Sequence, residues 1–116
     1  MAVRAFTVSY PGSNILVTWT GLLNGDTGAP FAIADWPDKT VQLTGTIGTG
    51  GSVRMEGSND GGTNWATLHQ PDNTDLTFTA LGMEFVVENP LLIRPNVIAG
   101  DGSTNFAVRL VGAKKI

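Results

Sequence analysis

The stretch "VRMEGSNDGGTNWATL", residues 53–68, decides the fold expected for this chain. Before the turn, Val53 and Met55 alternate with two charged residues, which puts the apolar side chains on one face of a strand. The sequence "NDGG" then supplies residues that tolerate a positive φ angle, as a tight turn requires. We therefore expect a β-hairpin that joins strands at 52–58 and 64–69, and a hairpin tip explains these residues without a ligand.

Similar short segments, rich in Val, Ile, Thr and Phe, recur between turn sequences such as "NGDTG" and "GDGS". In 39–47 and 104–111, apolar and polar residues alternate, which is typical of an antiparallel sheet with one buried face. No segment shows a sustained apolar period of about 3.6 residues, so almost no helix is expected. The strands are predicted at 3–9, 14–20, 39–47, 52–58, 64–69, 75–80, 83–88, 91–98 and 104–111.

Many short strands at this spacing predict an all-β fold, an antiparallel β-sandwich or jelly roll. The length of 116 residues suits a single domain spanning 1–116, with an N-terminal arm expected at 1–10 and a long loop at 21–38. The core is expected to consist of the inward-facing side chains of two facing sheets: Val41, Leu43, Val53, Met55, Trp65, Leu68, Phe78, Phe85, Val87, Ile93, Phe106, Val108 and Leu110.

Charge and hydropathy argue against two classes of partner. The formal net charge is −3 and charged residues make up only 15 % of the chain, so binding to a nucleic-acid backbone is not expected. No apolar run approaches the roughly 20 residues of a membrane-spanning helix, and the N-terminal segment lacks the apolar core of a signal peptide. We therefore expect a protein that is made in the cytoplasm and binds no membrane.

Side chains that could carry out catalysis are scarce. The chain has no cysteine and a single histidine, His69, which stands beside "QP" at the end of a predicted strand. A serine–histidine–aspartate site would need this histidine and a serine such as Ser52 or Ser58, and no nucleophile motif supports it. Most aspartates lie in predicted turns, where their side chains bond to nearby backbone. We predict that the chain is not an enzyme and has no cofactor.

Two turn sequences, "SNDGGTN" and "PDNTD", offer oxygen ligands of the kind that Ca²⁺ prefers. Neither follows the spacing of a helix-loop-helix calcium site, and turns of this composition form without an ion. No metal site is predicted.

The segment 21–38, "GLLNGDTGAPFAIADWPD", interrupts the alternation and carries the large apolar residues Phe31, Ile33 and Trp36. These side chains either cap the open end of the sandwich, which we favour, or form a loop that binds a partner. In the second case, changing Phe31 and Trp36 together to Ala would weaken partner binding and barely lower the melting temperature.

The sequences "DKTVQLTGTIGTGGSVRMEGSNDGGTNWATL", "LTFT" and "IRPNVIAGDG" lie within residues 24–111. Over that range the chain resembles small virion proteins of tailed bacteriophages, the capsid decoration or cement proteins. The resemblance implies a β-sandwich or jelly roll without catalytic residues. It also implies a place on the capsid exterior of the virion, where the protein would bind the phage major capsid protein and clamp neighbouring subunits.

A protein with this role needs an adhesive perimeter, and three segments supply candidates for it. Homo-oligomers, as a dimer or trimer, would multiply weak contacts with a symmetric shell. The partner-binding candidates come from the N-terminal arm, the long loop and the "ENPLLIRP" corner: Val3, Arg4, Phe6, Phe31, Ile33, Trp36, Leu91, Leu92 and Arg94. For the two arginines among them, the competing interpretation is a solvated surface charge.

The rhythm of "EGSNDG", Trp and "IRPNV" within 53–98 also resembles galactose-binding-like jelly rolls of the discoidin type. That resemblance implies an alternative function, a carbohydrate-binding module of a phage tail or fibre. Such a module needs an exposed aromatic side chain that stacks on a sugar, and Trp36 is the candidate for it. The sequence offers no matching cluster of an aromatic residue with arginine.

Overall fold

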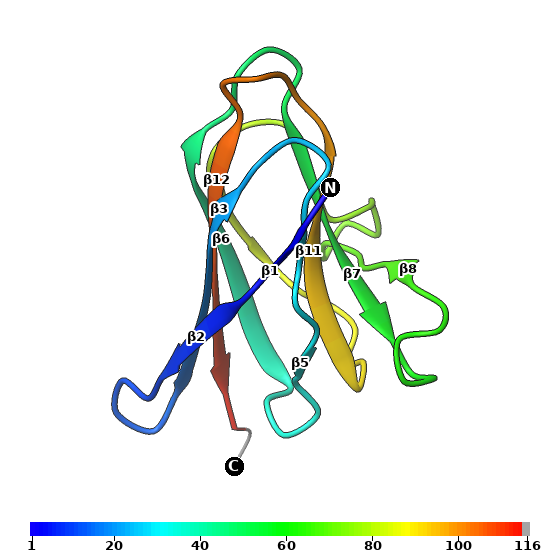
Figure 1. Ribbon diagram of the computed structural model, residues 1–116. Helices are drawn as coiled ribbons and strands as arrows, with labels where there is room; N and C mark the ends of the chain where they lie inside the picture. The colour runs from blue at the N-terminus through cyan, green and yellow to red at the C-terminus, as the bar shows by residue number, and fades with distance from the viewer. Residues whose placement is uncertain (115–116) are drawn as a thin grey trace.

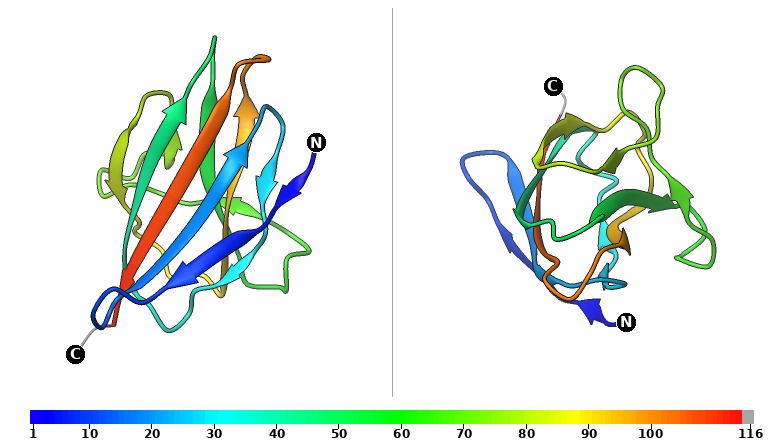
Figure 2. Two further views of the ribbon diagram at one scale, coloured as in Figure 1. Left: turned by 60° about the vertical axis from the view of Figure 1, so that its left-hand side comes forward. Right: turned by 90° about the horizontal axis from the view of Figure 1, so that it is seen from above.

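The computed structural model describes residues 1–114, and Figure 1 shows two β-sheets that face each other. The expected all-β sandwich is confirmed, and no helix occurs among the described residues. Viewed from above, the two sheets form layers around a central core (Figure 2). The interior between these layers contains the large apolar side chains, as alternation within the strands predicts.

The five-stranded sheet is antiparallel throughout, with β12 at its centre (Figure 2). Its strands, in spatial order, are β10 (Gly82–Phe85), β6 (Asp38–Thr46), β12 (Asn105–Ala113), β3 (Ile15–Leu22) and β2 (Phe6–Ser9).

The seven-stranded sheet is built around β11, and its pairings are antiparallel except for the parallel pair of β1 and β4. Its main path is β1 (Val3–Arg4), β4 (Thr27–Gly28), β11 (Leu92–Ala99), β7 (Ser52–Ser58) and β8 (Ala66–Thr67). Two further strands join it, β5 (Phe31–Ala32) on β11 and β9 (Thr77–Phe78) on β7.

The hairpin expected at residues 52–69 is present. Strand β7 pairs antiparallel with β8, and the second strand is shorter than expected. Gly61 and Gly62 adopt φ angles of 77° and 90°, the region that the turn demanded. The hydroxyl of Ser58 accepts a hydrogen bond from the Gly62 N–H at 3.0 Å, so the tip is fixed by its own side chains.

The expected core is largely confirmed, with three errors. Phe85 and Val87 are 40 % and 47 % exposed, whereas Val86 between them is fully buried. Side chains alternate strictly between the two faces of a strand, so a shift of one residue turned both expected core residues outward. Trp65 is half-buried, because it lies beside the hairpin tip and not between the sheets. Further core residues, none of which was expected from the sequence to be in the core, are Ile15, Val17, Trp19, Leu22, Ile33, Leu76, Val86 and Val97.

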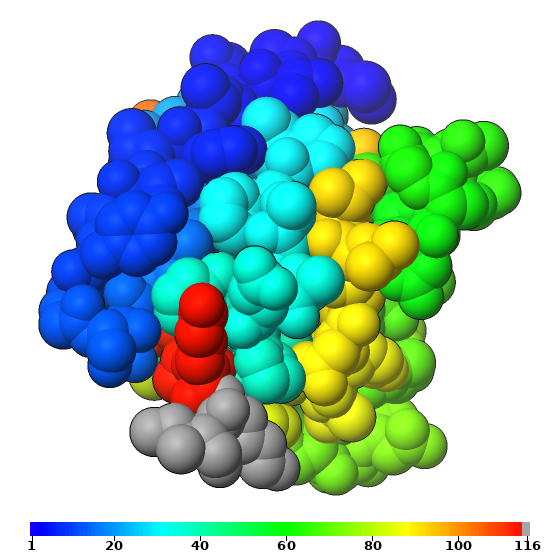
Figure 3. All heavy atoms as spheres, turned by 90° about the horizontal axis from the view of Figure 1, so that it is seen from below, coloured from blue at the N-terminus to red at the C-terminus, as the bar shows by residue number. Residues whose placement is uncertain are grey.

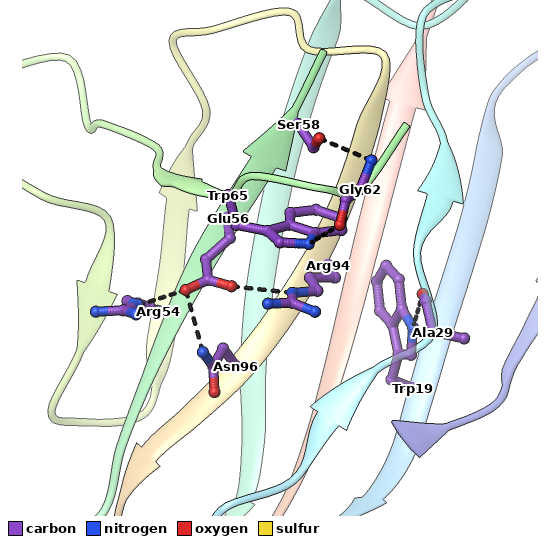
Figure 4. Close-up of polar contacts among 9 residues, drawn as sticks. All are labelled: Trp19, Ala29, Arg54, Glu56, Ser58, Gly62, Trp65, Arg94 and Asn96. Atoms are coloured by element: carbon purple, nitrogen blue, oxygen red, sulfur yellow. Dashed lines mark hydrogen bonds and ion pairs between the residues drawn. The ribbon is translucent and has the colours of Figure 1, made fainter. Parts of the chain in front are cut away.

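Trp19 explains the sequence of β4. Its indole N–H donates to the carbonyl of Ala29 at 3.0 Å (Figure 4), and its ring packs against Gly28. A Cβ at Gly28 would stand 2.5 Å from the Trp19 Cδ1 and 2.6 Å from Pro95 Cδ. Only glycine therefore lets β4 pack this closely against Trp19 of β3 and Pro95 of β11.

The N-terminal segment is part of both sheets and is not a free arm. Strand β2 extends the five-stranded sheet, and β1 crosses to pair with β4 of the seven-stranded sheet (Figure 1). The N–H of Thr27 donates to Ala2 and that of Ala29 donates to Arg4, at 3.0 and 2.8 Å. The segment expected as an arm at 1–10 therefore contributes strands at 3–4 and 6–9 to the two sheets, and its adhesive role stays a prediction.

Candidate functional site

The arginine of the N-terminal segment is not a solvated charge. The Nε of Arg4 donates to Asp26 Oδ2 at 2.7 Å, and Asp26 also accepts the N–H groups of Ala2 and Leu23 at 2.9 Å each. Burial would raise the pKa of Asp26, but these hydrogen bonds outweigh burial and hold the pKa below its usual value. Of the three candidates in this segment, Val3 stays exposed.

The third candidate in this segment, Phe6, is half-buried and packs edge-to-face against two aromatic rings. Its ring centroid lies 6.2 Å from that of Trp19 and 5.2 Å from that of Phe31. The Phe6 and Phe31 side chains therefore stabilise the fold by packing on the core, and only part of their surface is open to a partner.

Residues 31–38, the later part of the segment 21–38, cover the lower end of the sandwich, where they appear in cyan in Figure 3. Ile33 is 1 % exposed and belongs to the core, so its assignment as a partner-binding residue is wrong. Phe31 and Trp36 are half-buried and pack against the core. The structure agrees with the favoured interpretation of a cap, because Ile33 is buried and Phe31 and Trp36 pack against the core at this end.

Trp36 is therefore not an open stacking platform. Its ring centroid lies 6.5 Å from that of Tyr10, and the Nζ of Lys114 lies 5.2 Å from the Trp36 centroid. These neighbours occupy ring surface that a sugar would need, so the candidate aromatic of the carbohydrate hypothesis is placed unfavourably.

Of the three partner-binding candidates at 91–94, one is exposed and two are partly buried. Leu91 is exposed, Leu92 is half-buried, and Arg94 reaches across the outer face of the seven-stranded sheet to the carboxylate of Glu56. The register places Arg94 directly opposite Glu56 on neighbouring strands, so Arg94 is an ion-pair partner and not a solvated charge.

Glu56 is the centre of a polar cluster on this outer face (Figure 4). Its carboxylate accepts from the Nε of Arg94 at 2.9 Å, the Nε of Arg54 at 2.6 Å and the Nδ2 of Asn96 at 3.1 Å. Burial would raise the pKa of Glu56, but these hydrogen bonds, first that of Asn96 and then those of the arginines, lower it. A buried carboxylate with three donors is ionised and fixed in place.

Trp65 completes the cluster. The guanidinium carbon of Arg94 lies 4.0 Å from the centroid of the Trp65 ring, and the indole N–H donates to the carbonyl of Gly62 at 3.0 Å (Figure 4). The sequence revealed no cluster of an aromatic residue with arginine, but the structure contains one, in which Arg94 stacks on Trp65. It depends on the pairing of two strands, and alternation within one strand carries no signal for it.

A groove of about 560 Å³ opens beside the hairpin. It lies between the hairpin and the segment 88–90, with Trp65 on the hairpin side. The groove is lined by Gly57, Ser58, Asn59, Asn64, Trp65, Ala66, Thr67, Leu68, His69, Glu88, Asn89 and Pro90.

His69 lies at this groove and is paired with Glu88. The Nδ1 of His69 is 2.5 Å from Glu88 Oε2, and the His69 N–H donates to Glu88 Oε1 at 2.8 Å. Burial would raise the pKa of Glu88, but the hydrogen bonds from His69 lower it. The hydroxyl of Ser58 bonds to Asp60 and Gly62, so it is not placed as the nucleophile of a site with His69.

An exposed apolar row runs along the edge strand β10. We call it the β10 stripe; its residues are Leu81, Met83, Phe85 and Val87, which are 49 %, 57 %, 40 % and 47 % exposed. Their spacing of two places them on one face of the extended segment. A hollow of about 410 Å³ adjoins the stripe and is lined by Pro37, Asp38, Phe85, Val87 and Asn89. The stripe was missed because two of its members were assigned to the core.

Within residues 1–114, no helix has the length and apolar character needed to cross a bilayer. No three acidic, histidine or cysteine side chains among those residues are grouped so that they could hold a metal ion.

No protein-family model matches the sequence, and no curated protein matches it. Among solved structures, the chain is similar to the SPBc2 prophage-derived protein YomS, with a TM-score of 0.63 at 10 % sequence identity. The match covers 90 % of this chain and 97 % of that one, so the two proteins share a fold along nearly their whole lengths.

Two further likenesses are lower. An 11S allergen of Cocos nucifera L. matches 88 % of this chain with 23 % of its own, at a TM-score of 0.42 and 12 % identity. The IMPa metallopeptidase, in complex with T-antigen, matches 97 % of this chain with 13 % of its own, at a TM-score of 0.39 and 16 % identity. Neither is close enough to bear on function.

Proposed function

We propose that this chain is a structural protein of a bacteriophage virion that binds the outer surface of the capsid. There it stabilises contacts between major capsid protein subunits, as a decoration or cement protein. The resemblance of residues 24–111 to such proteins supports this, and so does the fold shared with a prophage-derived protein over nearly the full length of both chains.

The observation that carries the proposal is the β10 stripe. A sheet edge in a monomeric protein is usually protected by charges, proline or a covering segment. Strand β10 carries only one charged residue, Glu84, and ends in exposed apolar side chains. An apolar row beside unpaired backbone groups suits a second protein that adds a strand or packs on the edge.

The energetics fit a weak contact that is repeated many times. Burying the exposed half of one such side chain contributes roughly 1 kcal/mol, so the stripe contributes about 4 kcal/mol before the cost of association. That is too little for tight binding of one copy. Simultaneous contacts with several subunits of a symmetric shell raise the effective concentration and convert weak contacts into stable attachment.

A co-sedimentation assay tests the proposal. Capsids of the parent phage that lack this protein are mixed with purified protein and pelleted, and bound protein is measured against its concentration. Changing Phe85 to Lys should weaken binding at least about tenfold, because the change buries a charge in place of apolar surface. Ile98, 44 % exposed on the other sheet, provides the matched control Ile98→Lys.

Saturable binding that is lost with Phe85→Lys and kept with Ile98→Lys would support the proposal. Failure of the parent protein to bind capsids would contradict a capsid role, and equal binding of both variants would contradict the stripe as the contact. Light scattering of the free protein tests the separate prediction of a dimer or trimer.

A further inference from the structure

We propose that the groove beside the hairpin binds a short, neutral oligosaccharide. Its volume of about 560 Å³ lies within the range of ligand sites, roughly 300–1,000 Å³. None of the β10 stripe residues lines the groove, although Asn89 lines both the groove and the hollow that adjoins the stripe. The inference therefore goes beyond attachment to a capsid.

The floor of the groove is closely packed and apolar. Leu68 and Pro90 are buried there, and Gly57 lies beneath them. A Cβ at Gly57 would be 2.8 Å from the Leu68 Cδ2 and from Pro90 Cβ, so these atoms fill the space that a side chain would occupy. A packed floor keeps its shape without a ligand, which reduces the cost of ordering on binding.

Trp65 forms part of one wall of the groove, and residues that do not contribute polar side chains to the groove hold its ring in position. Arg94 stacks on it at 4.0 Å, Glu56 fixes Arg94 at 2.9 Å, and the indole N–H is bonded to Gly62. The open surface of the ring lines the groove. The C–H groups on one face of a sugar ring are weakly positive and apolar, which suits the negative face of an indole.

Three asparagines supply hydrogen-bonding groups for hydroxyls. Asn59 accepts from the N–H of Leu91 at 2.9 Å, and Asn89 accepts from Lys39 Nζ at 2.6 Å. Asn64 donates through Nδ2 to Asp60 at 2.8 Å. Each amide is thus fixed through one of its two ends, and the other end makes no hydrogen bond with the described residues.

The groups left for a ligand are the NH₂ donors of Asn59 and Asn89 and the carbonyl acceptor of Asn64. Sugar hydroxyls both donate and accept, so they can satisfy all three groups. Among the described lining residues there is no lysine or arginine, and the carboxylate of Glu88 is paired with His69. That charge distribution disfavours phosphorylated and sulfated ligands. Strand β8 has only two residues, too few for an extended peptide to pair along.

A nitrogen-15 NMR titration tests the proposal with millimolar chitotriose, maltotriose and lactose, and with a neutral serine–threonine pentapeptide. At least one sugar should shift the side-chain amide signals of Asn59 and Asn89 and the indole N–H signal of Trp65. Trp65→Ala should weaken that binding at least about tenfold, or about 1.4 kcal/mol.

Asn59→Asp and Asn89→Asp give sharper variants, because aspartate keeps the acceptor that Leu91 and Lys39 use and replaces the NH₂ donor with a negatively charged oxygen. Each should weaken binding at least about fivefold. Asn105→Asp, an exposed residue of β12, introduces the same charge away from the groove and should leave affinity unchanged. These variants keep the test valid if Trp65→Ala fails to fold.

Absence of shifts with all three sugars, shifts confined to other residues, binding of the pentapeptide alone, or full affinity in both aspartate variants would overturn the proposal. Capsid co-sedimentation of the same variants separates the two functions. If the groove binds a sugar and the stripe binds the capsid, Asn59→Asp, which lines the groove and not the hollow beside the stripe, loses only sugar binding, and Phe85→Lys loses only capsid binding.

Discussion

Replacing Asp26 by Ala should destabilise the whole sandwich, because this carboxylate ties the N-terminal segment to both sheets. It accepts from Ala2, Arg4 and Leu23, at 2.9, 2.7 and 2.9 Å, and is only 3 % exposed. Alanine would leave these donors without their acceptor while keeping the backbone intact.

The expected loss can be worked out donor by donor. The side chain of Arg4 is 37 % exposed, so its ion pair is worth at most about 1 kcal/mol after screening by solvent. The N–H of Leu23 would lose its charged acceptor at a cost of about 1–3 kcal/mol, while Ala2 is only half-buried and its N–H can bond to water. The sum is about 3 kcal/mol, or about 10–15 °C in melting temperature for a domain of this size.

Thermal unfolding followed by circular dichroism measures this loss, and hydrogen exchange should show faster exchange in strands β1 and β2. Asp26→Asn, which keeps the shape and removes the charge, should fall between the parent and Asp26→Ala. A decrease of less than about 1 kcal/mol would refute the reasoning, because the N-terminal segment would then be held by other contacts.

The pH dependence follows from the lowered pKa of Asp26. A carboxyl group whose pKa is lower in the folded state stabilises the fold above its unfolded pKa of about 3.9. That stabilisation is lost as the pH falls through the folded value. The difference in melting temperature between parent and Asp26→Ala should therefore be constant near neutral pH and shrink below about pH 4.

Three further predictions concern the polar cluster around Glu56, the close packing at Gly28 and the cap formed by Phe31 and Trp36. Glu56→Gln should lower the free energy of unfolding in urea by about 2 kcal/mol, because an amide cannot accept from all three donors; an unchanged midpoint would contradict this. Gly28→Ala should cost about 3 kcal/mol in the same assay, since the new Cβ would stand 2.5 Å from Trp19; a neutral effect would mean that the strands separate freely. Phe31→Ala combined with Trp36→Ala should lower stability by about 4 kcal/mol, the opposite of the expectation for an exposed loop, and a melting temperature within about 3 °C of the parent would contradict their role as a cap.

The sequence predicted the features that depend on local pattern. Alternation at Val53 and Met55, and at Phe106, Val108 and Leu110, identified strands and their inward faces correctly. It failed at 83–88, where several consecutive apolar residues leave either register consistent with the pattern, and Val86 is the one that is buried.

Features that join distant segments could not be predicted in the same way. The stack of Arg94 on Trp65 depends on β11 pairing with β7, and the role of Asp26 depends on β1 crossing between the sheets. Neither pairing leaves a signal within its own segment. The groove also arises from such pairings, since it brings residues 57–69 together with 88–90.

The most direct test of the proposed capsid role is the number of copies of this chain in purified virions of a phage whose genome encodes it, measured by quantitative mass spectrometry against the major capsid protein. A protein that clamps neighbouring subunits over the whole shell should be present in a fixed ratio to the capsid protein, at many copies per particle. Absence from the particle, or only a few copies in each, would contradict the account.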